Sequence, residues 1–233
     1  GGRVFSGCAS AVPVPPPGAF VLSGGRTPGS LSGLARGLFT VQDPTQQRAV
    51  LALAPRPGER VLDVCAAPGG KATQIAETAG DRGEVLACDP DAERLPLVAE
   101  AAARLGLKSI ALREVGVPPL PEDMSAAFDA VLVDAPCSNT GAINRRVEAR
   151  WRAAPEALAA LSERQRAILS AALDAVRPGG RLVYSTCSLL DAENGGVVRS
   201  AVEGRDGWRL VREETVLPEE GRNDGGYWAL LAP

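Results

Sequence analysis

The chain has 233 residues, 45% of them hydrophobic, and a formal net charge of −3 at pH 7; this supports one sizeable domain and argues against extensive non-specific binding to nucleic acid. No apolar stretch approaches the roughly 18–20 residues of a membrane helix, and the first residues lack the charged and apolar regions of a signal peptide. The chain contains no histidine, which excludes Ser-His and Cys-His hydrolases and histidine-containing zinc fingers.

Residues 1–36 are rich in Gly, Pro and Ser and show no helical period. This composition predicts an irregular remnant or extension with a lone strand at 19–22. The chain starts without Met, so we expect it to be a processed or trimmed one. Farther along, Asp43 as N-cap and Pro44 in the first turn predict a helix that continues to Leu53.

From residue 60 onward, strand patterns alternate with helix patterns. Strands are predicted at 61–65, 84–88, 109–112, 128–133 and 181–184, and helices at about 70–79, 92–105, 158–176 and 191–202. Two closing strands, at 208–211 and 227–231, predict an antiparallel hairpin. The whole pattern predicts an α/β fold with a mostly parallel, twisted sheet.

The segment VLDVCAAPGGK, at Val61–Lys71, places a glycine-rich turn between a strand and a helix. Gly69 and Gly70 allow a ligand to approach the backbone, and the helix N-terminus offers free N–H groups. Asp89 ends the next strand, where an acid accepts hydrogen bonds from ribose hydroxyls. Because neither GxGxxG nor GxxxxGK[ST] is present, we expect an adenosine-bearing ligand that is not a dehydrogenase cofactor. The alternative is that Asp89 caps a helix and the glycines serve packing.

Two further segments, DAPCSNTG at Asp134–Gly141 and YSTCSLLDAEN at Tyr184–Asn194, each place a cysteine just beyond a hydrophobic run. Residues beyond the carboxyl ends of neighbouring strands converge on one crevice. We therefore expect Cys137 and Cys187 to share a site beside the glycine-rich turn.

The other cysteines are interpreted as structural. Cys8 and Cys88 are expected to be small buried hydrophobes, and Cys65 is expected to pack beside the ligand. The five cysteines form no CxxC pair, which favours reduced thiols and a cytoplasmic location. No further ligands stand at metal spacing, so no metal is expected.

A basic cluster, Arg145, Arg146, Arg150 and Arg152, follows the first cysteine segment. Arg145, Arg146 and Arg150 are candidates for contact with the phosphates of a nucleic acid. The alternative is an ordinary solvated surface.

Taken together, VLDVCAAPGGKATQIAE, CDPDAERL, FDAVLVDAPCSNTG and RLVYSTCSLLDAEN resemble successive motifs of the S-adenosylmethionine-dependent RNA cytosine-5 methyltransferases of the Sun (Fmu) type, which include bacterial 16S rRNA enzymes. GLFTVQDPTQQ and DGGYWALL resemble the first and last segments of that catalytic domain. The resemblance implies a Rossmann-like class I methyltransferase fold with a C-terminal antiparallel hairpin. It assigns residues 37–233 to the catalytic domain and implies S-adenosyl-L-methionine as cofactor.

The resemblance also implies roles for individual residues. A thiolate added to C6 of cytosine makes C5 nucleophilic toward a methyl sulfonium. In this family the attacking thiol corresponds to Cys187, and the thiol that releases the methylated base corresponds to Cys137. Asp134 would bind the cytosine ring, and Lys71 would orient Asp134 or the thiols. The implied cofactor-binding residues are Asp63, Cys65, Ala66, Ala67, Pro68, Gly69, Gly70, Lys71, Asp89, Arg94 and Asp134.

The substrate expected first is rRNA, for a monomer with no membrane or metal partner. A tRNA substrate is the alternative within the same reaction, and an RNA-binding module without turnover is the alternative from another class. Three positions depart from the family pattern. Val115 stands where an Asp that contacts adenine is usual, Val147-Glu148 where a Pro-Asp pair is usual, and Gly226 where a bulky aromatic is expected.

Overall fold

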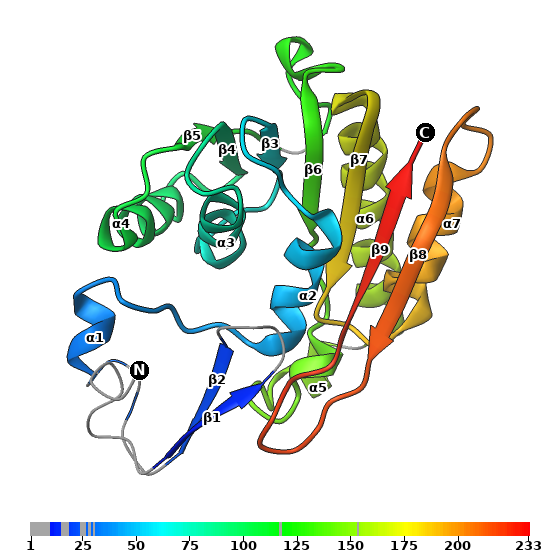
Figure 1. Cartoon of the computed structure of the whole chain (residues 1–233). Helices are drawn as coiled ribbons and strands as arrows, with labels where there is room; N and C mark the ends of the chain where they lie inside the picture. The colour runs from blue at the N-terminus through cyan, green and yellow to red at the C-terminus, as the bar shows by residue number, and fades with distance from the viewer. Residues whose placement is uncertain are drawn as a thin grey trace.

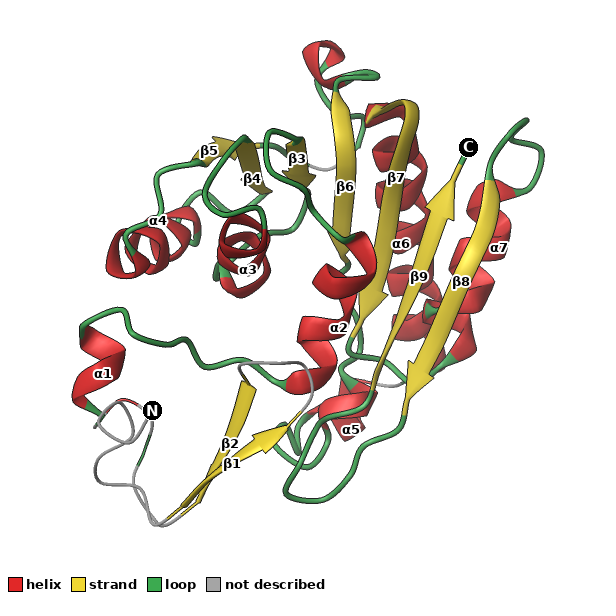
Figure 2. Ribbon diagram, viewed as in Figure 1, coloured by secondary structure: helices red, strands yellow, loops and turns green. Residues whose placement is uncertain are grey.

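The computed structural model describes residues 10–14, 19–23, 27, 29, 31–116, 118–152 and 154–233. A seven-stranded sheet forms its centre, with helices on both faces (Figures 1 and 2). The strands are β3 (Arg60–Asp63), β4 (Glu84–Asp89), β5 (Ile110–Glu114), β6 (Phe128–Asp134), β7 (Val176–Thr186), β8 (Arg209–Val216) and β9 (Gly226–Ala232). The helices around it are α2 (Pro44–Leu53), α3 (Gly70–Thr78), α4 (Leu95–Leu105), α5 (Ala149–Arg152), α6 (Pro155–Ala175) and α7 (Gly195–Val202).

The strand order is β5-β4-β3-β6-β7-β9-β8. Strands β3 to β7 all run parallel to one another, whereas β9 runs antiparallel to both β7 and β8. The predicted α/β fold, with a mostly parallel sheet and a closing antiparallel hairpin, is confirmed. The order reverses between β3 and β6, and in such sheets ligands bind beyond the carboxyl ends of the strands at this point.

Two hydrophobic layers cover the sheet. On one face α2, α3 and α4 pack with Ala130 and Leu132 of β6, and on the other α6 and α7 pack with Val131 and Val133. Successive side chains of a strand point to opposite faces, so a strand covered on both faces must be apolar throughout. This is why β6 is a near-continuous apolar run.

Several element boundaries follow from local chemistry. Helix α2 starts as predicted, because the Asp43 side chain accepts a hydrogen bond from the backbone N–H of Thr45 at 2.9 Å. Helix α4 starts at Leu95, later than predicted, because the Asp91 side chain accepts from Glu93 N–H and holds a turn.

Strand β7 starts at Val176, five residues earlier than the strand predicted from 181. Val176 pairs with Phe128, and Arg181 pairs with Ala130. The register shift leaves residues 177–180, which contain the Pro-Gly-Gly sequence, as an irregularity in the strand rather than the turn that precedes it.

Near the N-terminus, the strand predicted at 19–22 is present as β2 (Ala19–Ser23), but it is not a lone strand. It pairs antiparallel with β1 (Ser10–Val14), which the sequence analysis missed because proline within a run argues against a strand. A short helix, α1 (Ser32–Ala35), follows. Cys8 lies outside the described residues. Among those residues, no helix is both long and apolar enough to cross a membrane.

Candidate active site

The two cysteine segments leave β6 and β7, which are adjacent parallel strands. Their loops contact each other, since the backbone N–H of Gly141 donates to the carbonyl of Cys187 at 2.9 Å. A hydrogen bond joins the two thiols and shifts their pKa values in opposite directions. The structure therefore brings together the two thiols that the sequence placed in one site.

The surroundings make the two thiols unequal. The hydrogen bond with Cys137 lowers the pKa of Cys187, and the nearby ammonium of Lys71 acts in the same direction. The same hydrogen bond and burial raise the pKa of Cys137 well above its usual value. These shifts favour a thiolate at Cys187 over a thiolate at Cys137.

A buried ion pair lies beside the thiols. Lys71, in the first turn of α3, is 8% exposed, and its Nζ lies 2.7 Å from Oδ2 of Asp134 at the end of β6. Burial opposes the charge of Lys71, but the negative groups around it, Asp134 first and then Cys187 and Asp63, together raise the pKa of Lys71. The other oxygen of Asp134 accepts from the Ser185 hydroxyl at 2.9 Å. The contact expected between Lys71 and Asp134 is thus present.

A second carboxylate ties the two cysteine loops together. Glu193, which is fully buried, accepts from the backbone N–H of Ser138 at 2.9 Å and from the Ser188 hydroxyl at 2.6 Å. It also accepts from the Ser138 hydroxyl and from Gln165 on α6. Ser138 and Ser188 directly follow Cys137 and Cys187, so Glu193 fixes one loop against the other.

The glycine-rich turn is braced by the next strand. Asp89 accepts from the backbone N–H of Ala67 at 3.1 Å, and Arg94 donates to the Ala67 carbonyl at 2.8 Å. Gly69 has φ 108°, in the left-handed region, and a Cβ there would lie 3.0 Å from the Cα of Val98. The predicted cofactor residues therefore cluster at the carboxyl ends of β3 and β4, and Asp89 and Arg94 also hold the turn itself.

Asp63, at the end of β3, is fully buried, and neither of its carboxylate oxygens has a hydrogen-bond partner among the described residues. Burial and the negative charge of Asp134 raise the pKa of Asp63 to about 7. Burial also raises the pKa of the Cys65 and Cys88 thiols, which suits packing rather than reaction.

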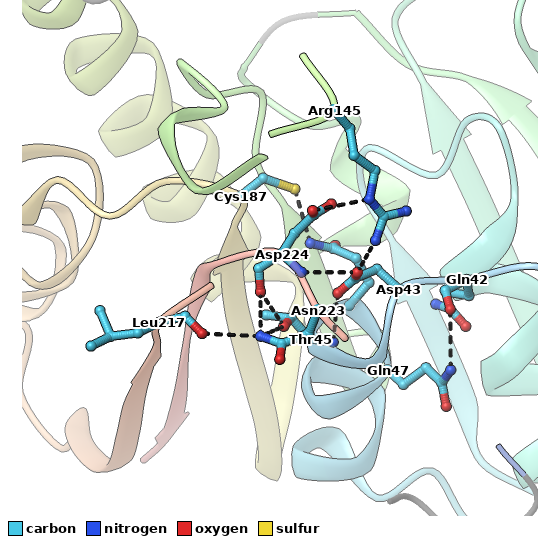
Figure 3. A network of polar contacts seen from close by, with 10 residues as sticks. Gln42, Asp43, Thr45, Gln47, Arg145, Cys187, Leu217, Asn223 and Asp224 are labelled. Atoms are coloured by element: carbon cyan, nitrogen blue, oxygen red, sulfur yellow. Dashed lines mark hydrogen bonds and ion pairs between the residues drawn. The ribbon is translucent and has the colours of Figure 1, made fainter. Parts of the chain in front are cut away.

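The basic cluster is divided by the structure. Arg145 forms ion pairs with Asp43 and Asp224, and its Nε lies 3.1 Å from Oδ1 of Asp224 (Figure 3). Its guanidinium thus joins the N-cap of α2 to the loop between β8 and β9. Arg146 and Arg150 are exposed and form no ion pair within the described part of the chain.

Two of the departures from the family pattern have a structural explanation. Val115 is 5% exposed and belongs to the core around β4 and α6. A Cβ at Gly226 would lie 2.8 Å from the carbonyl oxygen of Thr186 and 3.0 Å from Cγ2 of Thr45. The close approach of the Cys187 loop therefore excludes the bulky aromatic expected at position 226. Nothing in the structure explains Val147-Glu148.

Sequence reasoning missed three polar residues of the site: Gln46, Ser185 and Glu193. The Nε2 of Gln46 donates to the Cys187 sulfur at 2.9 Å, and its Oε1 accepts from Lys71. Helical phase was the available signal, because the predicted N-cap at Asp43 fixes which side chains of the first turn face the sheet. Glu193 lies within the second cysteine segment, but nothing in that segment indicates a role for it.

Comparison with known proteins places the chain in a family. A family model described as 16S rRNA methyltransferase RsmB/F matches residues 50–230. Ribosomal RNA small subunit methyltransferase B of Vibrio cholerae is 40% identical over 208 residues, covering 87% of this chain and 48% of that protein. The chain spans about half the length of the curated relatives it matches.

Solved structures of related proteins have a similar fold. NSun6 from Pyrococcus horikoshii with SFG has a TM-score of 0.80 and 30% identity, covering 88% of this chain and 56% of that one. A methyltransferase homologue from the same organism has a TM-score of 0.79 and 27% identity, covering 91% of this chain and 74% of that one. The expected class I methyltransferase fold is confirmed. The chain belongs to the RsmB/F family of 16S rRNA methyltransferases.

Proposed function

We propose that this chain transfers a methyl group from S-adenosylmethionine to C5 of a cytosine in RNA, through a covalent bond between Cys187 and C6. The observation that carries the proposal is the placement of two cysteines on adjoining loops beside the buried ion pair of Lys71 and Asp134. The names of the relatives support rRNA as the substrate ahead of tRNA. Both thiols, Lys71 and Asp134 are present together, which argues against an RNA-binding module without catalytic activity. We further propose a cytoplasmic monomer that needs no metal.

The residues at the ends of β3 and β4 suit the cofactor. Asp63 is a buried carboxylate that lacks a partner among the described residues, and an ammonium group placed beside it would supply one. Asp89 keeps free lone pairs for ribose hydroxyls, and the turn at 66–70 lies beside it, held by the hydrogen bond from Ala67 N–H. When bound, S-adenosylmethionine supplies an electrophilic methyl group on a sulfonium sulfur.

The protein's own groups carry out the remaining chemistry. The Cys187 thiolate adds its electron pair to C6, and the electrons of the C5–C6 bond make C5 able to attack the methyl carbon. Asp134 accepts a hydrogen bond from the exocyclic amine of the base and so orients the ring. Lys71 holds Asp134 in place. After methyl transfer C5 must lose a proton, and the electrons of that C–H bond re-form the double bond as Cys187 leaves C6.

Cys137 is assigned to this release step. Once the Cys187 sulfur is bonded to carbon it no longer carries charge, so one of the two main reasons for Cys137 to stay protonated is removed. Cys137 then gives its proton to water, and the resulting thiolate takes the proton from C5. No histidine is available for this task.

RNA is expected to approach over the exposed face of α5. Arg146 and Arg150 offer positive charge there. Trp151, which is 85% exposed on the same helix, offers a ring on which an unstacked base can lie. Arg145, held in its ion pairs, is expected to shape the loop more than to bind phosphate.

Trapping experiments test the proposal. Cys187→Ser removes the soft nucleophile, so it should abolish both methyl transfer and any covalent adduct with RNA. Cys137→Ala should methylate once and then remain bonded to the RNA, which would give a slow-migrating band on a denaturing gel. The buried Cys88→Ala serves as control and should turn over. A trapped band from Cys187→Ser with none from Cys137→Ala would reverse the two roles.

A further inference from the structure

The Gln46 side chain connects the Cys187 thiol with the ammonium group of Lys71. Its Nε2 lies 2.9 Å from the sulfur of Cys187, and its Oε1 accepts a hydrogen bond from Nζ of Lys71. Gln46 stands in the first turn of α2, which the Asp43 side chain caps. It precedes residues 50–230, the part of the chain matched by the family model.

The partners of this amide determine its orientation. A lysine ammonium has only donors, so the amide oxygen must face Lys71 and the NH2 group must face the sulfur. A sulfur that accepts an N–H hydrogen bond is favoured as thiolate over thiol. Gln46 therefore presents a donor to the atom that the proposed reaction uses as nucleophile.

The other groups around Cys187 explain why a neutral donor matters. Asp134, at the end of β6, opposes a negative charge on the sulfur, and Cys137, on the loop after β6, shares a hydrogen bond with that sulfur. Lys71, on α3, favours the thiolate but is itself paired with Asp134 at 2.7 Å. The Gln46 amide stabilises the thiolate through a hydrogen bond. Because the amide is neutral, Asp134 does not compete for it as it does for the ammonium of Lys71.

We propose that Gln46 is a hydrogen-bond donor to the reacting thiolate of Cys187 and holds Lys71 between that thiol and Asp134; the proposal rests on the assignment of Cys187 as nucleophile. When sulfur bonds to C6 it loses its negative charge, and the hydrogen bond from Gln46 weakens. When the methylated base departs, the charge returns to sulfur and the bond strengthens. Gln46 thus favours both the ready nucleophile and the leaving thiolate.

Alkylation of Cys187 over a pH series tests this proposal without RNA or cofactor. Iodoacetamide labelling of the whole chain is quantified on the peptide that contains Cys187. Gln46→Met keeps the side-chain length but removes both hydrogen bonds, so the labelling midpoint should rise by about one pH unit. Gln46→Glu keeps an acceptor for Lys71 but brings negative charge to the sulfur, so the midpoint should rise further. Gln47→Ala, at the next position of α2, should keep the wild-type midpoint.

Unchanged midpoints in both Gln46 variants, with native circular dichroism, would overturn the proposal. A rise of the labelling midpoint in Gln46→Met but not in Gln46→Glu would also overturn the donor role. Gln46→Glu keeps the acceptor for Lys71, so this result would mean that the contact with Lys71, and not the hydrogen bond to sulfur, determines the midpoint. The labelling does not depend on methyl transfer. A chain with the expected shifts but no RNA methylation would therefore contradict the proposed function while supporting the assignment of Gln46.

Discussion

Cys137 and Cys187 lie on loops that leave the neighbouring strands β6 and β7, and what differs is the set of groups around each sulfur. The sulfur of Cys187 accepts a hydrogen bond from Gln46 and lies near the ammonium of Lys71. The hydrogen bond with Cys187 and burial both disfavour the ionisation of Cys137. At the scale of single residues, therefore, the proposed division of labour between two identical side chains follows from the different groups around them.

Asp63 leads to a prediction at the same scale. Its pKa of about 7 reflects burial and the charge of Asp134, and a bound ammonium would lower it. Binding therefore releases a proton, so affinity should rise with pH up to about 7 and then level off. One unit below the pKa only about a tenth of Asp63 is ionised, so affinity for S-adenosylhomocysteine should be roughly tenfold weaker there.

Calorimetry over a pH series measures this dependence. Asp63→Asn should flatten it, while Asp91→Asn, which changes an exposed acid beside Asp89, should retain it. A wild-type affinity that is constant between pH 6 and pH 8 would contradict the assignment of Asp63 to a cationic ligand.

At the scale of elements, the site depends on how loops from β6 and β7 are joined. Glu193 receives four hydrogen bonds on two oxygens, from Ser138, Ser188 and Gln165. These hydrogen bonds lie in the protein interior, where a donor that loses its partner cannot form a hydrogen bond with water instead. The geometry of the two thiols is therefore a property of two loops and one carboxylate together.

Glu193→Gln should lower the free energy of unfolding by about 1–3 kcal/mol, because an NH2 group would replace one acceptor and face existing donors. Urea unfolding measures the effect. The control is Glu163→Gln on α6, where the ion pair with Arg166 is exposed; such surface pairs contribute at most about 1 kcal/mol. Equal unfolding midpoints for the two variants would show that Glu193 is not a structural joint.

What the sequence could predict depended on whether the signal lies within one short segment or in contacts between distant segments. Strands such as β6 were evident because burial on both faces makes them apolar, and α2 was evident because Asp43 and Pro44 mark its start. Residues in the glycine-rich and cysteine segments were found because those segments have distinctive motifs. Gln46 and Glu193 were missed because their importance arises from partners far along the chain.

At the scale of the whole molecule, an acidic protein is proposed to bind a polyanion, which requires a local positive surface. The structure divides its basic cluster into Arg145, which is paired with Asp43 and Asp224, and Arg146 and Arg150, which form no ion pair with the residues that the structure describes. Charge already neutralised within the protein releases few counterions when RNA binds.

Replacement of Arg146 and Arg150 together by Ala should therefore weaken RNA binding. It should lower the slope of log affinity against log salt by about 1.4, or about 0.7 for each phosphate contact on a single strand. Fluorescence anisotropy with labelled RNA at several salt concentrations provides the measurement. Arg145→Ala should leave the slope nearly unchanged, and an equal decrease in both variants would mean that its ion pairs open on binding.

The position of β9 has a consequence for the order in which the site can form. Although last in sequence, β9 lies between β7 and β8, and pairs Tyr184 with Ala229 and Thr186 with Tyr227. During synthesis, β7 therefore keeps an open edge until Gly226–Ala232 leaves the ribosome. Because β7 ends next to Cys187, the strand edge beside the proposed nucleophile stays open until β9 pairs with it.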